Sequence, residues 1–280
     1  MSMTVNTNIA AMGSLNALEN TTSALNTSIE QLSTGLKING AGDNPSGEAI
    51  SQTMTAQING LNTAQQNAQD GLSALQTADG GLNTVDSILQ NINTLSVSAA
   101  NTATLTSGDV SLIQSQVTQL TSELDRMAST VAFNGKNLLD GSYTGESLQV
   151  SNGSQGGGAT DPNQISIIVS AVTSAALGLS GINLTTAAGA ASAITLVTSA
   201  INQVSNQRGA LGAVMDRLNY TVSNLGSEVQ NATASLSTLQ DVDMASAMSN
   251  YTKLQILQQS GTAMLAQANQ APSAVLKLLG

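Results

Sequence analysis

A heptad repeat of apolar residues is the feature that most constrains this chain. The clearest series advances alternately by three and four residues between positions 108 and 133: Val110, Ile113, Val117, Leu120, Leu124, Met127 and Val131. A repeat of 3.5 residues keeps one apolar stripe of a helix turned toward a partner helix. The series therefore predicts a helix that packs along another helix, and Asp109 is a suitable N-cap for it.

Two longer series extend the same pattern. One runs from Ile194 to Leu239 with Arg208 as its single polar member, and the other runs from Leu61 to Ile92 inside a helix predicted over 46–100. At ~1.5 Å per residue that helix is roughly 80 Å long, and such helices need partners in water. We predict a mainly α protein in which 43–140 and 193–240 form a long coiled-coil rod of three helices.

The two ends of the chain carry apolar stripes of their own. A helix-breaking segment at 39–45 and a slip in the repeat at 241–243 separate them from the rod. These interruptions lie about equally far from the two ends. We therefore predict that 1–42 and 241–280 are helical arms that pair as a second coiled coil.

The middle of the chain, 141–192, is rich in Gly, Ser and Thr. Short runs of high β-propensity at 147–150 and 165–169 flank a Gly-rich run at 152–158. Two such runs around a Gly-rich turn predict a small β-hairpin, which we place at the tip of the rod.

Composition excludes most chemistry. The 280 residues include no His, Cys or Trp and seven Lys plus Arg, and the formal net charge is −10. Imidazole catalysis, thiol chemistry and His- or Cys-ligated zinc are therefore absent, and few cations are available for phosphates. We expect no enzyme activity, no catalytic or cofactor-binding residues, no metal site, no nucleic acid, no membrane segment and no Sec-type signal peptide.

The arms hold more apolar side chains than one stripe between two helices can cover. An ordinary intramolecular helix pair is the simpler interpretation, but the excess favours burial against other copies of the chain. Unlike surfaces packed head to tail generate an open helical filament. The candidate subunit-packing residues are Ile9, Leu15, Leu25, Ile29, Leu32, Leu36, Met248, Tyr251, Leu254, Leu257, Met264, Leu265, Leu276 and Leu279.

Several segments resemble bacterial flagellin. They are 6–10 (NTNIA), 31–39 (QLSTGLKIN), 41–50 (AGDNPSGEAI), 67–71 (NAQDG), 133–139 (FNGKNLL), 255–270 (QILQQSGTAMLAQANQ) and 275–279 (VLKLL). The resemblance covers nearly the whole chain, and only 141–192, where flagellins vary, is nondescript. The resemblance implies a short, near-minimal subunit of the extracellular flagellar filament, with the arms as inner core, the rod as outer core and 141–192 as variable tip.

The same resemblance implies the partners. They are other copies of the chain, the flagellar cap, hook-junction proteins, a cytosolic flagellin chaperone that holds the C-terminal arm, and the flagellar type III export apparatus. Two alternatives remain open: a hook–filament junction protein, and a secreted adhesin or immune-ligand module that works through its tip.

One segment departs from the flagellin pattern. Many flagellins carry arginines and a glutamate here that a Toll-like innate receptor contacts. The corresponding residues of this chain are Leu89, Gln90, Asn91, Asn93 and Thr94, with Glu123 at an acidic position of the same surface. The missing charges predict weak or no receptor binding.

Overall fold

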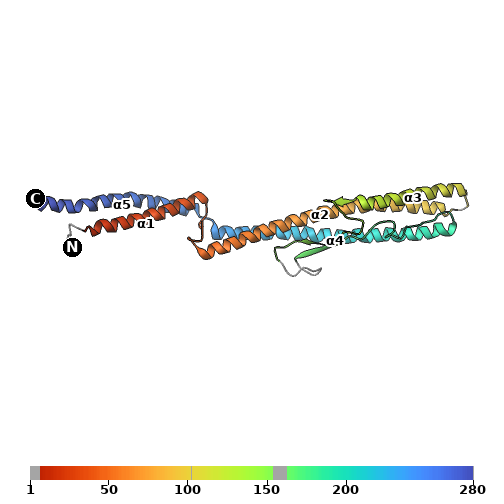
Figure 1. The fold of residues 1–280 in the computed structure, drawn as a ribbon, viewed down its shortest axis with the longest axis horizontal. Coiled ribbons are helices and arrows are strands. Elements are labelled where there is room, and N and C mark those ends of the chain that lie inside the picture. Colours follow the sequence, from red (N-terminus) through yellow and green to blue (C-terminus); the bar gives the residue numbers. More distant parts are fainter. Residues whose placement is uncertain (1–6, 102, 154–162, 280) are drawn as a thin grey trace. The chain divides into compact units, whose positions relative to one another are not determined.

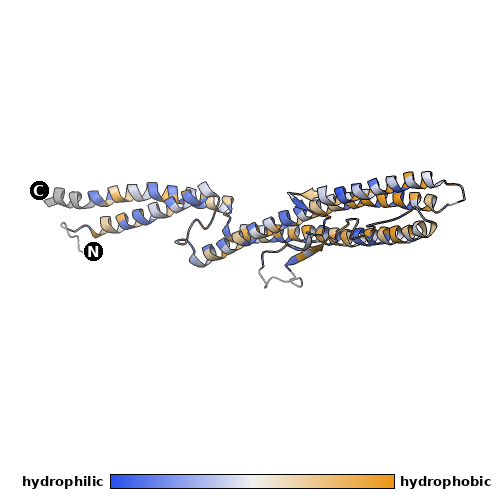
Figure 2. Ribbon diagram, turned by 45° about the vertical axis from the view of Figure 1, so that its right-hand side comes forward, coloured by the Kyte–Doolittle hydropathy of each residue, from blue (hydrophilic) through white to orange (hydrophobic). Residues whose placement is uncertain are grey.

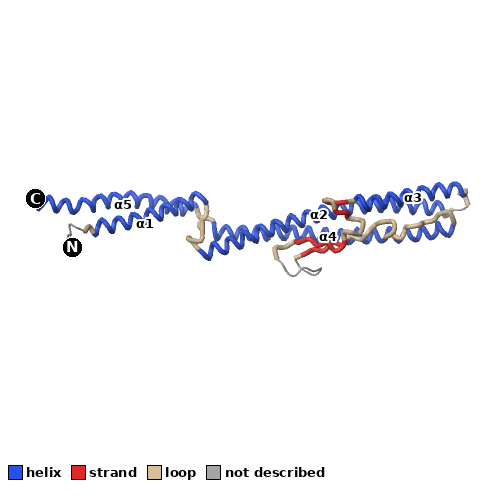
Figure 3. The backbone as a smooth tube through the Cα atoms, viewed as in Figure 1, coloured by secondary structure: helices blue, strands red, loops and turns tan. Residues whose placement is uncertain are grey.

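The computed structural model describes residues 7–101, 103–153 and 163–279, and within 271–279 only the backbone. Five helices contain most of these residues (Figures 1 and 3). The chain divides into two compact units, one made of 57–230 and the other of 1–56 with 231–280. Each unit is described in turn.

The unit 57–230 contains a three-helix bundle. It is formed by the corresponding parts of α2 (Pro45–Ala99) and α4 (Ala187–Gln240) and by all of α3 (Ser107–Thr130). The predicted heptad positions of all three helices form its core; its largest fully buried helical side chains are Leu75, Leu82, Leu89, Ile92, Leu124, Leu211 and Leu218. The mainly α fold and the three predicted helices are therefore confirmed, with the ends of α2 one residue from those expected.

The N-terminus of α3 differs from the prediction. Thr106, not Asp109, is the N-cap, and its hydroxyl accepts a hydrogen bond from the Asp109 amide. The Asp109 carboxylate in turn accepts from the Thr106 amide at 2.9 Å, which completes a capping box. The Thr106 hydroxyl also donates to the Asp109 carboxylate at 2.7 Å, and the two hydrogen bonds that this carboxylate accepts lower the pKa of Asp109, with the one from the hydroxyl as the larger cause. Asp109 is thus the third residue of α3, and it takes part in the cap without being the N-cap residue itself.

Arg208, the polar member of the α4 series, pairs with α2. Its Nε lies 2.8 Å from Oδ1 of Asp79, and about a third of each side chain is exposed. The hydrogen bond to Asp79 raises the pKa of Arg208. A charge can therefore occupy this heptad position, because it meets a carboxylate on the facing helix.

Two antiparallel hairpins follow α3. In the first, β1 (Ala132–Phe133) and β2 (Lys136–Asn137) are joined through Asn134 and Gly135, which both have positive φ. Such a pair is the turn whose twist matches that of antiparallel strands.

The second hairpin pairs β3 (Thr144–Gln149) with β4 (Gln164–Ile168), and confirms the predicted small sheet. Its Gly-rich turn lies outside the described residues. The position differs from the prediction, because the hairpin lies alongside α2 rather than at the end of the bundle. Asn67 Nδ2 donates to the Gln149 carbonyl, and Leu148 packs against Gly71, where a Cβ would collide with it. The missing side chain of Gly71 thus creates the docking place of β3.

The return from β4 to α4 is tied to α3. Oε1 of Gln114 accepts from the Leu184 amide at 2.7 Å, and its Nε2 donates to the Ile182 carbonyl. Farther along α3, the Asp125 carboxylate accepts from the amide and hydroxyl of Ser174, both at 2.7 Å. Polar side chains of α3 therefore provide hydrogen-bond partners for backbone groups of this connecting segment, which has no regular secondary structure.

The second unit contains an antiparallel pair of helices, α1 (Ile9–Thr34) and α5 (Met244–Leu279). Near its open end, Asn8 Nδ2 donates to the Ala268 carbonyl at 2.8 Å. At the other end, an antiparallel bridge joins Leu36 to Asp241. The predicted pairing of the terminal arms is therefore confirmed.

The bridge connects residues 35–37, just after α1, to residues 240–242, just before α5. The Lys37 amide donates to the Gln240 carbonyl at 2.6 Å, and the Val242 amide donates to the Gly35 carbonyl at 3.0 Å. Gly35 ends α1 in the left-handed conformation (φ 76°) that glycine adopts without strain. We call this pair of backbone hydrogen bonds the clasp.

In the part of the chain that the structure describes, one helix is long and apolar enough to cross a membrane by length and composition alone. This helix is α4, in which an 18-residue window reaches a mean hydropathy of 1.2. Its apolar residues Val197, Val204, Leu211 and Leu218 are buried in the bundle at a heptad spacing. Packing against α2 and α3 therefore accounts for them.

Candidate assembly surface

The contact between α1 and α5 combines small side chains and large ones in equal numbers. The side chains turned inward, which we call the arm seam, are half-buried or buried and repeat every three or four residues. They are Ala11, Ser14, Leu18, Thr21, Leu25, Ser28 and Leu32 on α1, and Ala247, Tyr251, Leu254, Gln258, Gly261, Leu265 and Ala268 on α5. Of these residues, Leu25, Ser28 and Ala247 are buried and the others are half-buried.

A small residue at the seam lets the two helices approach closely. A Cβ at Gly261 would lie 3.2 Å from Cδ1 of Leu18, within tight contact. Sequence reasoning that followed the largest apolar residues missed Ser14, Ser28 and Gln258. The regular spacing along each helix could have identified them, because these positions complete the series of three- and four-residue steps on α1 and α5.

Among the described side chains of the arms, most of the large apolar ones lie outside the seam, in solvent. We call them the exposed apolar set; Ile9 is 73% exposed, and Ile256 and Met264 are each 60% exposed. The full set is Ile9, Met12, Leu15, Ile29, Met244, Met248, Ile256, Leu257 and Met264. Figure 2 shows hydrophobic residues alternating with hydrophilic ones along both helices of the pair.

The structure divides the predicted subunit-packing residues into three groups. The first, at or beside the seam, contains Leu25, Leu32, Leu36, Tyr251, Leu254 and Leu265, all at least half-buried within the chain. The second, available to another molecule, contains Ile9, Leu15, Ile29, Met248, Leu257 and Met264. The side chains of Leu276 and Leu279 lie outside the described residues.

Few charges accompany this surface. Within α1 and α5 the charged residues are Glu19, Glu30, Lys253 and Lys277. Large exposed apolar side chains with few charges near them are typical of an interaction site, since little charge has to be desolvated when a partner covers it.

The residues of the predicted receptor-like surface lie on α2 and α3, but not all are accessible. Leu89 is fully buried in the bundle core. Gln90 is exposed, and its Nε2 donates to Asp86 at 2.8 Å. Asn93 is half-buried, and Asn91 and Thr94 are exposed. The segment therefore offers solvent three polar, uncharged side chains.

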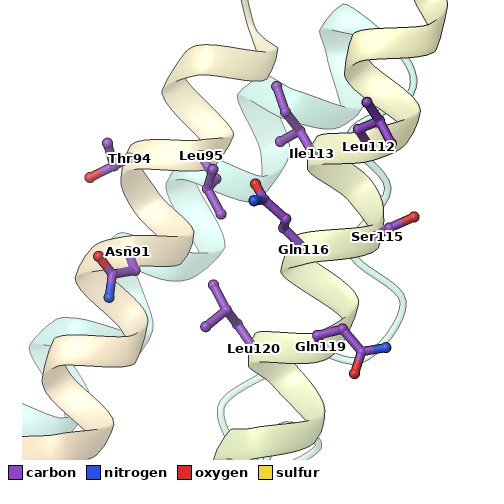
Figure 4. A pocket seen from close by; sticks show the side chains of 9 residues that line it. All are labelled: Asn91, Thr94, Leu95, Leu112, Ile113, Ser115, Gln116, Gln119 and Leu120. Carbon is purple, nitrogen blue, oxygen red and sulfur yellow. The ribbon is translucent and has the colours of Figure 1, made fainter.

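Asn91 and Thr94 line a surface groove of about 800 Å³ between α2 and α3 (Figure 4). Leu95, Leu112 and Leu120 provide much of the remaining lining, and no charged side chain lines it.

Glu123 lies on the exposed face of α3 and pairs with Arg126 one turn along. Nε of Arg126 donates to its carboxylate at 2.7 Å, and this hydrogen bond lowers the pKa of Glu123. The Glu123 carboxylate is therefore paired with a residue of its own helix.

Among the described residues, no group of three or more His, Cys, Asp or Glu is placed to hold a metal ion. The geometry of the arms is that of a packing surface: two paired helices with an apolar exterior.

Comparison with known proteins agrees with this description. Residues 5–144 match the bacterial flagellin N-terminal helical region, and residues 194–279 match the bacterial flagellin C-terminal helical region. A flagellin of Bacillus subtilis (strain 168) is 41% identical over 303 residues, which cover 99% of this chain and all of that protein. The flagellar filament 33 kDa core protein of Treponema phagedenis is 42% identical over 286 residues, with the same coverage.

Flagellin FlaB2 of Treponema pallidum (strain Nichols) is 41% identical, again over 99% of this chain and 100% of its own length. The crystal structure of Bacillus cereus flagellin aligns with a TM-score of 0.48 and 26% identity, covering 61% of this chain and 94% of that one. The names of the relatives are those of filament subunits, which favours this function over the junction-protein and adhesin alternatives. The family matches and full-length relatives show that this chain belongs to the bacterial flagellin family and is a structural subunit of the flagellar filament.

Proposed function

We propose that the α1–α5 pair is the part of the subunit that joins its copies into the filament, with the exposed apolar set as the joining surface. The observation that carries the proposal is the disposition of side chains in this pair. The seam within the subunit combines small residues with a few large ones, while other large apolar residues such as Ile9, Ile256 and Met264 face solvent.

Burial of these side chains in a neighbour supplies the free energy of assembly. A large apolar side chain contributes about 1.5–3 kcal/mol when it moves from water to a fully apolar contact. Several of them on each copy are sufficient to offset the entropy lost when a subunit joins a polymer.

The remaining assignments follow from membership of the family. The arms, 1–42 and 241–280, form the inner core of the filament, and 43–140 with 193–240 form the outer core, which leaves 141–192 as a short variable segment alongside it. The subunit leaves the cell through the flagellar type III apparatus, after a chaperone has held its C-terminal arm. It is added beneath the cap and beyond the hook-junction proteins, and it acts without enzyme activity or cofactor.

Weak or absent recognition by a Toll-like receptor is part of the same proposal. The accessible residues Gln90, Asn91 and Thr94 provide no charge, and Glu123 is engaged by Arg126. A reporter-cell assay against an Arg-bearing flagellin tests this; equal signalling by the two proteins would refute it.

The assembly proposal is tested by substituting single exposed residues. Ile29→Gln and Leu257→Gln each remove one apolar contact from the exterior of the arms without touching the arm seam. Ile168→Gln is the matched control, because Ile168 is 62% exposed on β4 of the other unit.

Sedimentation of purified protein, seeded with filament fragments at raised salt, measures the monomer left at equilibrium. We expect the two arm variants to leave roughly tenfold more monomer than the parent chain, as a loss of ~1.4 kcal/mol implies. Ile168→Gln should polymerise normally. Equal assembly by all three variants would show that the joining surface lies elsewhere.

A further inference from the structure

Methionine is the main oxidisable residue of this chain. The sequence contains nine Met but neither Cys nor Trp. A peroxide transfers one oxygen atom to a thioether sulfur, and exposed thioethers react most readily. The effect of such an oxidant on this protein therefore depends on where its methionines lie.

The exposed methionines are concentrated in one part of the molecule. Of the seven Met among the described residues, four are exposed, and all four lie on α1 or α5: Met12, Met244, Met248 and Met264. The other three, Met54, Met127 and Met215, are half-buried, and the last two pack against the bundle core.

We propose that Met12, Met244, Met248 and Met264 form an oxidation site that controls assembly, in which conversion of their thioethers to sulfoxides in the free subunit blocks polymerisation. The proposal rests on the proposed role of the exposed apolar set, to which all four residues belong. The oxidant is a peroxide: the sulfur lone pair attacks one peroxide oxygen and the O–O bond breaks. The products are one methionine sulfoxide and one water for each hydrogen peroxide, and the sulfur loses the two electrons that the peroxide gains.

The sulfoxide changes the property on which assembly depends. Its oxygen is a strong hydrogen-bond acceptor, so burial against an apolar neighbour leaves it unsatisfied. The seam residues of α1 and α5 are not altered, so the fold of the subunit is retained. Subunits that have already assembled have these sulfurs covered by neighbours and therefore react more slowly.

The test uses the full-length chain. Monomer is treated with hydrogen peroxide, the peroxide is destroyed with catalase, and peptide mapping by mass spectrometry identifies each methionine that gained an oxygen atom. Seeded sedimentation then gives the monomer concentration at equilibrium. We expect a rise of tenfold or more after oxidation, and recovery after treatment with methionine sulfoxide reductases A and B plus dithiothreitol.

Two multiple variants locate the effect. M12L/M244L/M248L/M264L should assemble equally well with and without peroxide, whereas M54L/M127L/M215L should remain sensitive, and both retain Met1 and Met3. Met and Leu are similar in volume, so either set should cost little in packing. Should the fourfold variant fail to assemble untreated, M248L and M264L alone should each lower the sensitivity of the parent chain.

The outcomes separate this inference from the proposed function. Untreated parent protein that fails to polymerise, or that polymerises regardless of the exposed apolar set, contradicts the proposed function. Parent protein that polymerises normally with all four residues oxidised, or a fourfold variant as sensitive as the parent, overturns the oxidation site alone. Equal oxidation rates in monomer and filament would also overturn it.

Discussion

Gly80 and Gly81 on α2 provide a matched test of how tightly the bundle packs. They are neighbours within the same helix, yet their surroundings differ. A Cβ on Gly81 would lie 2.8 Å from Cδ1 of Leu139 and 3.0 and 3.1 Å from the methyl groups of Val131. A Cβ on Gly80 would meet nothing within 4 Å. Gly81→Ala therefore forces side chains apart, whereas Gly80→Ala only adds a methyl group in solvent.

The two substitutions share one favourable contribution. Replacing Gly by Ala inside a helix stabilises by roughly 0.5–1 kcal/mol, because the unfolded chain loses less entropy on folding. Gly80→Ala should show this gain alone. Overpacking costs typically 1–3 kcal/mol, so Gly81→Ala should be destabilising by up to about 2.5 kcal/mol in net terms. The difference between the variants, about 1–3 kcal/mol, isolates the packing because the helix contribution cancels.

Differential scanning calorimetry of monomeric full-length protein measures both changes, and the transition of the 57–230 unit is the one followed. Urea unfolding monitored by circular dichroism provides an independent value. Equal stabilisation by the two substitutions would refute the reasoning, because it would mean that Val131 and Leu139 move aside at no cost.

Three further predictions concern charge and capping. Thr106→Ala should destabilise the 57–230 unit by about 1 kcal/mol in urea unfolding, as loss of an N-cap does. Because folding lowers the pKa of Asp109, its stabilisation is present above its unfolded pKa and is lost as pH falls through the folded value; thermal unfolding of parent and Thr106→Ala proteins should therefore converge in acid. A double-mutant cycle of Arg208→Met and Asp79→Asn should give a coupling of about 1 kcal/mol, and additivity would mean that the ion pair contributes nothing. With no His in the chain, filament supercoil should stay unchanged between about pH 6 and 8, and microscopy showing a polymorphic switch in that window would contradict this.

The bundle could be predicted closely because its helices obey local rules. The expected helix over 46–100 corresponds to α2, Pro45–Ala99, since Pro45 fixes where a helix can begin. The heptad series also predicts the buried positions, because in this unit each helix has partners within the same chain. Arg208 fits the series because the facing helix supplies Asp79.

Two features could not be predicted by the same reasoning. The heptad series does not show where the β3–β4 hairpin docks, because docking depends on Gly71 lying opposite Leu148, a contact between distant residues. In the arms, large apolar residues were expected to mark the helix contact, yet Ser28 is buried while Ile29 is exposed. A large apolar side chain indicates a surface that becomes buried. It does not indicate whether the same molecule or another one buries it.

The clasp and the arm pair have a consequence for the order in which the molecule folds. The bundle unit is one continuous segment, 57–230, whereas the other unit joins the two ends of the chain. The hydrogen bond from Asn8 to Ala268 spans 260 positions of sequence. Contacts between such distant residues form late, because a long loop must be closed first. A chain that is synthesised from its N-terminus can therefore complete the bundle while α1 still lacks its partner. The surface that we propose to meet other subunits takes shape only when the last helix has been made.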